Sequence, residues 1–162
     1  MPVIFLDIDG VLNRKRLFGG STPRVVDSDL LDCFRRVVRD TGAQVVLAST
    51  WRHDAAGLSA ARDQGVPFDD VLPDLRPRSR ADEVEQWLRA HQGVGRFAAV
   101  DDDDDGYGSI PLFQPVPRKG LTPELAQAIT AYLKGDSDRD FRRSALIRAF
   151  QNMRDALLGH RG

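Results

Sequence analysis

Three short apolar runs, each followed by polar residues, place the strongest constraint on how this chain can fold. They cover residues 3–8, interrupted only by Asp7, residues 44–48 and residues 96–100. Apolar runs of this length that are bounded by turn signals are typical of buried strands. Helical patterns lie between them, so the order of elements predicts βαβ units and hence a parallel sheet.

The helices are expected where apolar positions recur at helical spacing next to capping residues. One begins at Asp27 or Ser28 and stops at Gly42, and another is opened by the pair Thr122-Pro123. The predicted helices cover residues 28–41, 55–64, 81–91 and 122–133, and residues 110–116 are expected to add an edge strand. These elements predict a doubly wound, three-layer αβα fold of the Rossmann-like type.

The length of 162 residues suits one domain with one hydrophobic core. We expect residues 1–135 to form the α/β domain. In residues 136–162, apolar side chains recur at helical spacing, as at Phe141, Leu146, Phe150 and Leu157. This pattern predicts a C-terminal amphipathic helix that packs on the domain or on a partner subunit, as in a homodimer.

Charge and hydropathy exclude several classes of protein. The formal net charge is -1, so the chain as a whole lacks the basic footprint of a nucleic-acid-binding domain that acts through charge alone. No apolar run approaches the roughly 18 residues of a membrane span, and the N-terminus does not resemble a signal peptide. We therefore expect a cytoplasmic protein that does not contact a membrane.

Carboxylates follow two of the predicted strands. The first run ends in Asp7-Ile8-Asp9-Gly10, and the third is followed by five aspartates, residues 101–105. Ligands of open α/β sheets bind at the carboxyl ends of the strands. Carboxylates gathered there offer the oxygen ligands that Mg²⁺ prefers, so the sequence predicts a Mg²⁺ site.

The remaining polar groups at the strand ends suit a phosphoryl group. Ser49 and Thr50 follow the second run, and Arg80 opens the helix before the third. Hydroxyl and backbone N–H groups at a strand-to-helix turn bind phosphoryl oxygens, and an arginine neutralises their charge.

In these features the chain resembles the haloacid dehalogenase superfamily of phosphohydrolases over about residues 3–134. The four motifs of that superfamily appear in order. They are matched by Phe5-Leu6-Asp7-Ile8-Asp9-Gly10-Val11, by Val46-Leu47-Ala48-Ser49, by Arg80 with Arg78 and Arg76 as register alternatives, and by Ala99-Val100-Asp101-Asp102.

The resemblance implies a role for each matched residue. Asp7 is the expected nucleophile, which forms an aspartyl-phosphate, and Asp9 is the expected general acid and base. Asp7, the main-chain carbonyl of Asp9, and Asp102 or Asp101 are expected to hold Mg²⁺, with Asp105 as a further candidate. The expected phosphate-binding residues are Ser49, Thr50, Arg80 and Gly10.

The resemblance also implies a small member without a cap domain. Residues 12–26 and 50–80, where larger members carry a cap, are too short for one. An open site suits macromolecular substrates, and Arg52, Arg14 and the rest of the basic loop 14–16 are expected to contact them. Nucleotides, nucleic-acid ends, sugar phosphates and phosphoproteins all carry the phosphoryl group that this site would bind.

Several other interpretations stay open. A receiver-type switch would need its phosphoacceptor at the end of a middle strand, where this chain has Ser49. A non-catalytic phosphate-binding or interaction module would use the same fold without Asp7 and Asp9 acting as catalysts. A phosphotransferase would use the same nucleophile and a different acceptor.

Overall fold

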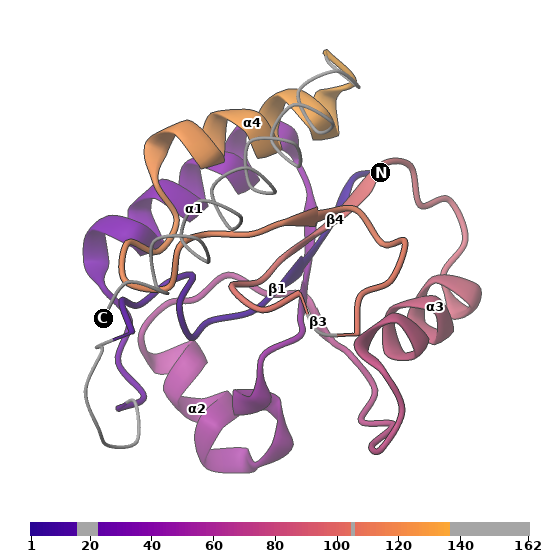
Figure 1. Cartoon of the computed structure of the whole chain (residues 1–162), viewed down its shortest axis with the longest axis horizontal. Coiled ribbons are helices and arrows are strands. Elements are labelled where there is room, and N and C mark those ends of the chain that lie inside the picture. Colours follow the sequence, from indigo (N-terminus) through magenta and orange to yellow (C-terminus); the bar gives the residue numbers. More distant parts are fainter. Residues whose placement is uncertain (16–22, 105, 137–162) are drawn as a thin grey trace, which may run out of the picture.

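A five-stranded parallel sheet forms the centre of the protein (Figure 1). The computed structural model describes residues 1–15, 23–104 and 106–136. The strand order is β3-β2-β1-β4-β5. The strands are β1 (Val3–Leu6), β2 (Gln44–Leu47), β3 (Asp70–Val71), β4 (Phe97–Val100) and β5 (Leu112–Phe113). The predicted parallel α/β fold is confirmed.

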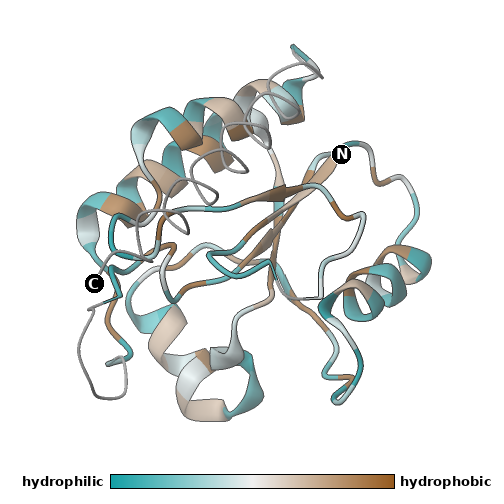
Figure 2. Cartoon of the chain, viewed as in Figure 1, coloured by the Kyte–Doolittle hydropathy of each residue, from teal (hydrophilic) through white to brown (hydrophobic). Residues whose placement is uncertain are grey.

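Helices cover both faces of this sheet. They are α1 (Ser28–Thr41), α2 (Ala55–Asp63), α3 (Arg80–Ala90) and α4 (Pro123–Lys134), with a short 3₁₀ helix η1 (Thr50–His53). α1 and α4 pack together on one face, and α3 lies on the other (Figure 1). The strands are the most hydrophobic segments, and the polar sides of the helices face outward (Figure 2).

The central strand β1 shows why the sheet needs two helical layers. Its residues alternate between the faces, as side chains in a strand must. Ile4 and Leu6 pack with α1 and α4, whereas Val3 and Phe5 pack with α3. All four are completely buried, which explains the continuous apolar run in the sequence.

The predicted helix ends agree with the structure at the best-marked positions. Asp27 is the N-cap of α1 and Gly42 ends the helix in the left-handed region, with φ of 63°. Thr122 caps α4, where its side chain accepts a hydrogen bond from the Leu125 N–H group. Ser79 caps α3 and makes a capping box with Asp82, so α3 begins at Arg80.

The register of the strands brings the ends of β1, β2 and β4 to one level. Leu6 pairs with Leu47 on one side and with Val100 on the other. The Asp7 N–H group donates to the Val100 carbonyl at 2.9 Å, and the Ala48 N–H group donates to the Leu6 carbonyl at 2.7 Å. The residues directly after these strands therefore lie side by side at one edge of the sheet.

Larger relatives could carry a cap domain in residues 12–26 or 50–80. In their described parts these two segments contain only loops and short elements. Residues 50–80 contain η1, α2 and β3. No helix in the described parts of the chain is long and apolar enough to cross a membrane. The predicted C-terminal helix falls almost wholly on residues 137–162, outside the described residues, so that helix and its packing stay predictions.

Candidate active site

Three carboxylates meet at the carboxyl edge of the sheet. Asp7 follows β1, and Asp101 and Asp102 follow β4. One ligand oxygen of each side chain lies within 4.8 Å of the others. This is the convergence that the sequence predicted, and the strand register produces it.

Burial and, to a smaller extent, mutual repulsion both oppose ionisation of these carboxylates. Burial, and then the charge of Asp101, raise the pKa of Asp7 well above its usual value, against the lowering effect of the Ile8 N–H group. Burial also raises the pKa of Asp101, although the Asp103 N–H group and the Tyr107 hydroxyl both donate to its carboxylate. A cation bound between the two groups would relieve this repulsion.

Asp102 offers a free ligand atom at this place. Its Oδ1 atom is buried and has no hydrogen-bond partner among the described residues. A Cβ atom on Gly10 would lie less than 3.0 Å from the Asp102 carboxylate, so the lack of a side chain at Gly10 lets this carboxylate sit against the loop after β1. A buried acceptor without a donor is costly. With three carboxylates around it, this donor set fits a hard divalent cation such as Mg²⁺.

Lys15 supplies part of the positive charge that the carboxylates need. Its Nζ atom lies 2.6 Å from Asp102 Oδ2. Burial lowers the pKa of this ammonium group, but the hydrogen bond to Asp102 and the charges of Asp102, Asp7 and Asp9 outweigh burial, so that the pKa is raised. The sequence placed Lys15 in a basic loop facing the substrate, and the structure shows it bound to a candidate metal ligand.

Asp9 is held apart from this cluster by two buried side chains. Asn13 Nδ2 donates to its Oδ1 atom at 2.8 Å, and Trp51 Nε1 donates to its Oδ2 atom at 3.0 Å. Trp51 is buried, and its indole N–H group reaches the predicted general acid, a contact that the sequence did not indicate. The predicted Asp9 carbonyl ligand stays a prediction, and Asp105 lies outside the described residues.

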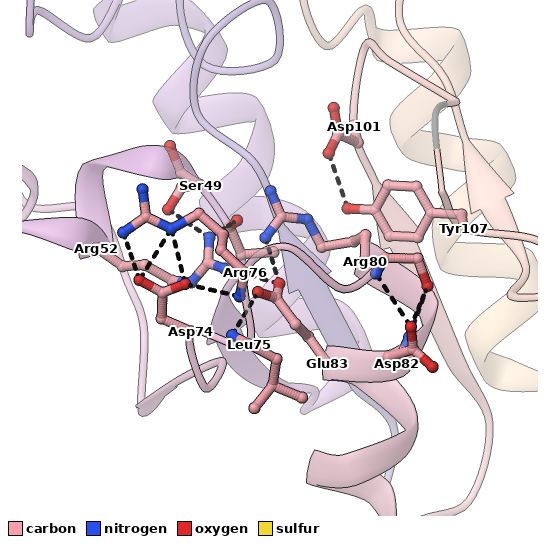
Figure 3. Close-up of polar contacts among 12 residues, drawn as sticks. Ser49, Arg52, Asp74, Leu75, Arg76, Arg80, Asp82, Glu83, Asp101 and Tyr107 are labelled. Atoms are coloured by element: carbon pink, nitrogen blue, oxygen red, sulfur yellow. Dashed lines mark hydrogen bonds and ion pairs between the residues drawn. The ribbon is translucent and has the colours of Figure 1, made fainter.

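Three of the four predicted phosphate-binding residues follow β2 or open α3, and the fourth, Gly10, lies in the loop after β1. Ser49 follows β2, is completely buried and caps η1, and its Oγ atom accepts from the Trp51 N–H group at 3.3 Å. Thr50 opens η1 and is exposed. Arg80 opens α3, and Figure 3 shows its guanidinium group against Glu83, with Tyr107 reaching Asp101 nearby.

Arg80 is the best placed of the three candidates for the third motif. Burial opposes its charge, but the charges of Tyr107, Glu83 and Asp101 raise the pKa of its guanidinium group. Arg76 instead pairs with the neighbouring Asp74 at 2.6 Å and is 64% exposed. Arg78 is exposed as well.

The two predicted substrate contacts are engaged elsewhere. The Arg52 side chain is only 2% exposed, and it donates to the Ala48 and Ser49 carbonyls and pairs with Glu83. The Arg52 guanidinium is therefore held by partners in the interior, and its predicted contact with a substrate stays a prediction. Arg14 pairs with Asp27 and Asp29 at the start of α1, and Arg16 lies outside the described residues.

Fold and site together define the class of protein. A parallel sheet with Asp7 and Asp9 after its central strand, an acidic pair after the next strand, and Arg80 at a helix start is the arrangement of the haloacid dehalogenase superfamily. The family model described as "HAD domain in Swiss Army Knife RNA repair proteins" matches residues 3–126. The chain therefore belongs to this family, whose members are generally hydrolases and phosphatases. Searches of curated proteins and of solved structures gave no match.

Proposed function

We propose that this protein is a Mg²⁺-dependent phosphomonoesterase that acts on phosphorylated RNA ends through an aspartyl-phosphate at Asp7. The observation that supports this proposal most is the cluster of Asp7, Asp101 and Asp102, in which the buried Asp102 Oδ1 atom has no hydrogen-bond partner among the described residues. Phosphoryl transfer to a carboxylate needs positive charge at such a cluster, because nucleophile and substrate are both anions. Bound Mg²⁺ would supply that charge and screen the phosphate from Asp7.

The reaction proceeds in two displacements. In the first, an Asp7 carboxylate oxygen attacks phosphorus, the bond from phosphorus to the ester oxygen breaks, and protonated Asp9 gives its proton to the departing oxygen. In the second, Asp9 takes a proton from water, which attacks the same phosphorus atom, and inorganic phosphate leaves Asp7. The Ser49 hydroxyl and the Arg80 guanidinium bind the phosphoryl oxygens during both steps.

The preference for RNA ends rests on the family and on the small size of the segment between η1 and α3, where a cap domain could lie. The description of the matching family refers to RNA repair. The described part of the segment between η1 and α3 holds only α2, β3 and loops, which suits a substrate too large to be enclosed. Lys15, with a side chain 38% exposed, adds a cation at the same edge.

The test measures phosphate release from a panel of substrates, with Mg²⁺ or with EDTA. The panel contains p-nitrophenyl phosphate, mononucleotides, a sugar phosphate, a phosphopeptide, and RNA and DNA oligonucleotides phosphorylated at either end. We expect Mg²⁺-dependent release, fastest from an RNA end. Release without Mg²⁺, or faster release from another class, would contradict the proposal. No release from any substrate would favour the non-catalytic module, and transfer to an added alcohol would favour the phosphotransferase.

A further inference from the structure

Among the described residues, the carboxylate of Asp9 accepts one hydrogen bond on each of its oxygen atoms. Asn13 Nδ2 occupies Oδ1 at 2.8 Å, and Trp51 Nε1 occupies Oδ2 at 3.0 Å. The two donors come from different parts of the chain, the loop after β1 and the helix η1 after β2. Because the donors lie on separate elements, together they restrain both the position and the plane of the carboxylate.

Asn13 is itself fixed in place. It is 4% exposed, its Oδ1 atom accepts from the Gly10 N–H group at 2.9 Å, and its Nδ2 atom also donates to the Val25 carbonyl at 3.1 Å. Its amide is therefore oriented by three partners, one of which is Asp9. This network fixes the loop that carries Asp9 to the segment before α1.

Trp51 is held by packing. It is 2% exposed and lies in the core cluster on the α1 and α4 side of the sheet. A packed indole ring changes its direction only at high cost, because core side chains occupy single rotamers at high density. Asp9 is thus aligned by a rigid donor on one oxygen and by a hydrogen-bonded amide on the other.

We infer that Trp51 and Asn13 are positioning residues for proton transfer by Asp9, an inference that rests on the proposed function. A carboxylate oxygen has two acceptor lone pairs, so a single donor on each oxygen leaves a place for the transferred proton. The donors stop the side chain from rotating among its staggered conformations. Proton transfer depends steeply on this alignment.

The variant Trp51→Phe removes the indole N–H group and keeps a buried aromatic ring. The control Trp87→Phe makes the same change on the opposite face of the sheet. There the Trp87 side chain packs in the other core cluster, and its Nε1 atom donates to Asp70 Oδ2 at 2.7 Å. Both variants lose one buried indole donor to a carboxylate, so general effects on packing are matched.

The readout is the dependence of kcat/KM on the leaving group. This constant covers the steps up to departure of the leaving group, and p-nitrophenolate leaves without a proton, whereas an alkoxide needs one. For Trp51→Phe we expect a loss of about tenfold or more in kcat/KM on an RNA end or another alkyl phosphate. On p-nitrophenyl phosphate we expect a loss of about twofold or less, and Trp87→Phe should not separate the substrates.

The outcomes distinguish this inference from the proposed function. Equal losses on both substrates in Trp51→Phe would overturn the inference and assign Trp51 a structural role. Absence of turnover in the wild type on both would instead overturn the proposed function. A structural readout then remains: the chain has two tryptophans, so its NMR spectrum has two indole N–H signals, assigned by the two Phe variants. Asp9→Ala should shift the Trp51 signal and leave that of Trp87 in place, and an unmoved Trp51 signal would refute the contact.

Discussion

At the scale of single residues, Gly10 determines how closely the Asp102 carboxylate can approach the loop after β1. Gly10 has φ of 80°, and a Cβ atom there would lie less than 3.0 Å from Asp102. Gly42 has a similar φ of 63°, but no atom of the described residues lies within 4 Å of its Cβ position. Both glycines therefore have a left-handed backbone conformation, but only at Gly10 would a Cβ atom also clash with a neighbouring carboxylate.

The variant Gly10→Ala should therefore disturb both the fold and the site. We expect a loss of about 2–4 kcal/mol in the free energy of unfolding, from the left-handed backbone and the clash together. Mg²⁺ binding should weaken about tenfold, because the displaced carboxylate is a candidate ligand. Urea denaturation and calorimetric Mg²⁺ titration measure these effects.

Gly42→Ala is the matched control. It should lose only about 1 kcal/mol, from its backbone conformation, and should bind Mg²⁺ as the wild type does. Equal Mg²⁺ affinity in Gly10→Ala and Gly42→Ala would show that Asp102 does not depend on this close approach.

Site residues that directly follow a strand could be predicted from the sequence. Contacts at the site between residues far apart in the sequence could not. Asp7 and Asp101 meet because Leu6 and Val100 are in register. The contacts of Trp51 and Lys15 join residues 42 and 87 positions apart, which no local pattern shows. The burial of Arg52 was likewise not predicted, because its partner Glu83 lies on another helix.

At the scale of elements, Glu83 joins α3 to η1 and to the loop before α3. Its Oε2 atom accepts from Arg52 and from Arg80, and its Oε1 atom accepts from the Leu75 N–H group at 3.2 Å. The Glu83 side chain is 2% exposed. This carboxylate therefore holds in place the guanidinium group of Arg80, the proposed phosphate ligand at the start of α3.

The variant Glu83→Gln leaves two guanidinium groups sharing a neutral partner in a buried place. We expect a loss of about 3–5 kcal/mol in the free energy of unfolding. Glu85→Gln on the same helix is the control, because Glu85 pairs with Arg89 where both side chains are exposed. That control should change stability by about 0.5 kcal/mol or less. Thermal unfolding of both variants tests this, and similar losses would refute the role of Glu83.

Element prediction from the sequence succeeded where periodicity and caps agree and failed where an element is very short. The ends of α1 are defined by Asp27 and Gly42 as expected. β3 was not predicted, since Asp70–Val71 has only two residues and exists through its pairing with β2. The predicted edge strand at residues 110–116 is present as the shorter β5.

At the scale of the whole molecule, the buried carboxylates link stability to pH and to Mg²⁺. Asp7 and Asp101 have pKa values raised above the ordinary value of 3.8 in the folded protein. The folded state therefore binds their protons more tightly than the unfolded state does. The stabilisation from protonation is complete below the ordinary value and is lost as pH rises through the raised values.

Mg²⁺ should consequently stabilise the protein more at neutral pH than in acid. We expect the increase in Tm on adding Mg²⁺ to be larger at about pH 7.5 than at about pH 5, because the cation replaces the protons that are lost. Asp7→Asn removes one of the two groups with a raised pKa and should reduce this difference. Thermal unfolding at both pH values measures it, and an equal Mg²⁺ effect at both would contradict a cation site among these carboxylates.

The most direct test of the account is to trap the phosphoryl group on Asp7. Asp9→Asn, mixed with Mg²⁺ and p-nitrophenyl phosphate, should release p-nitrophenolate once and then stop, because this leaving group needs no proton whereas the attacking water needs a base. After an acid quench, peptide mass spectrometry should find one phosphoryl group on Asp7, and none when EDTA replaces Mg²⁺. Phosphate release that persists in Asp7→Asn, or a wild type that turns over while no phosphoryl group is found on Asp7 in Asp9→Asn, would contradict the central claim.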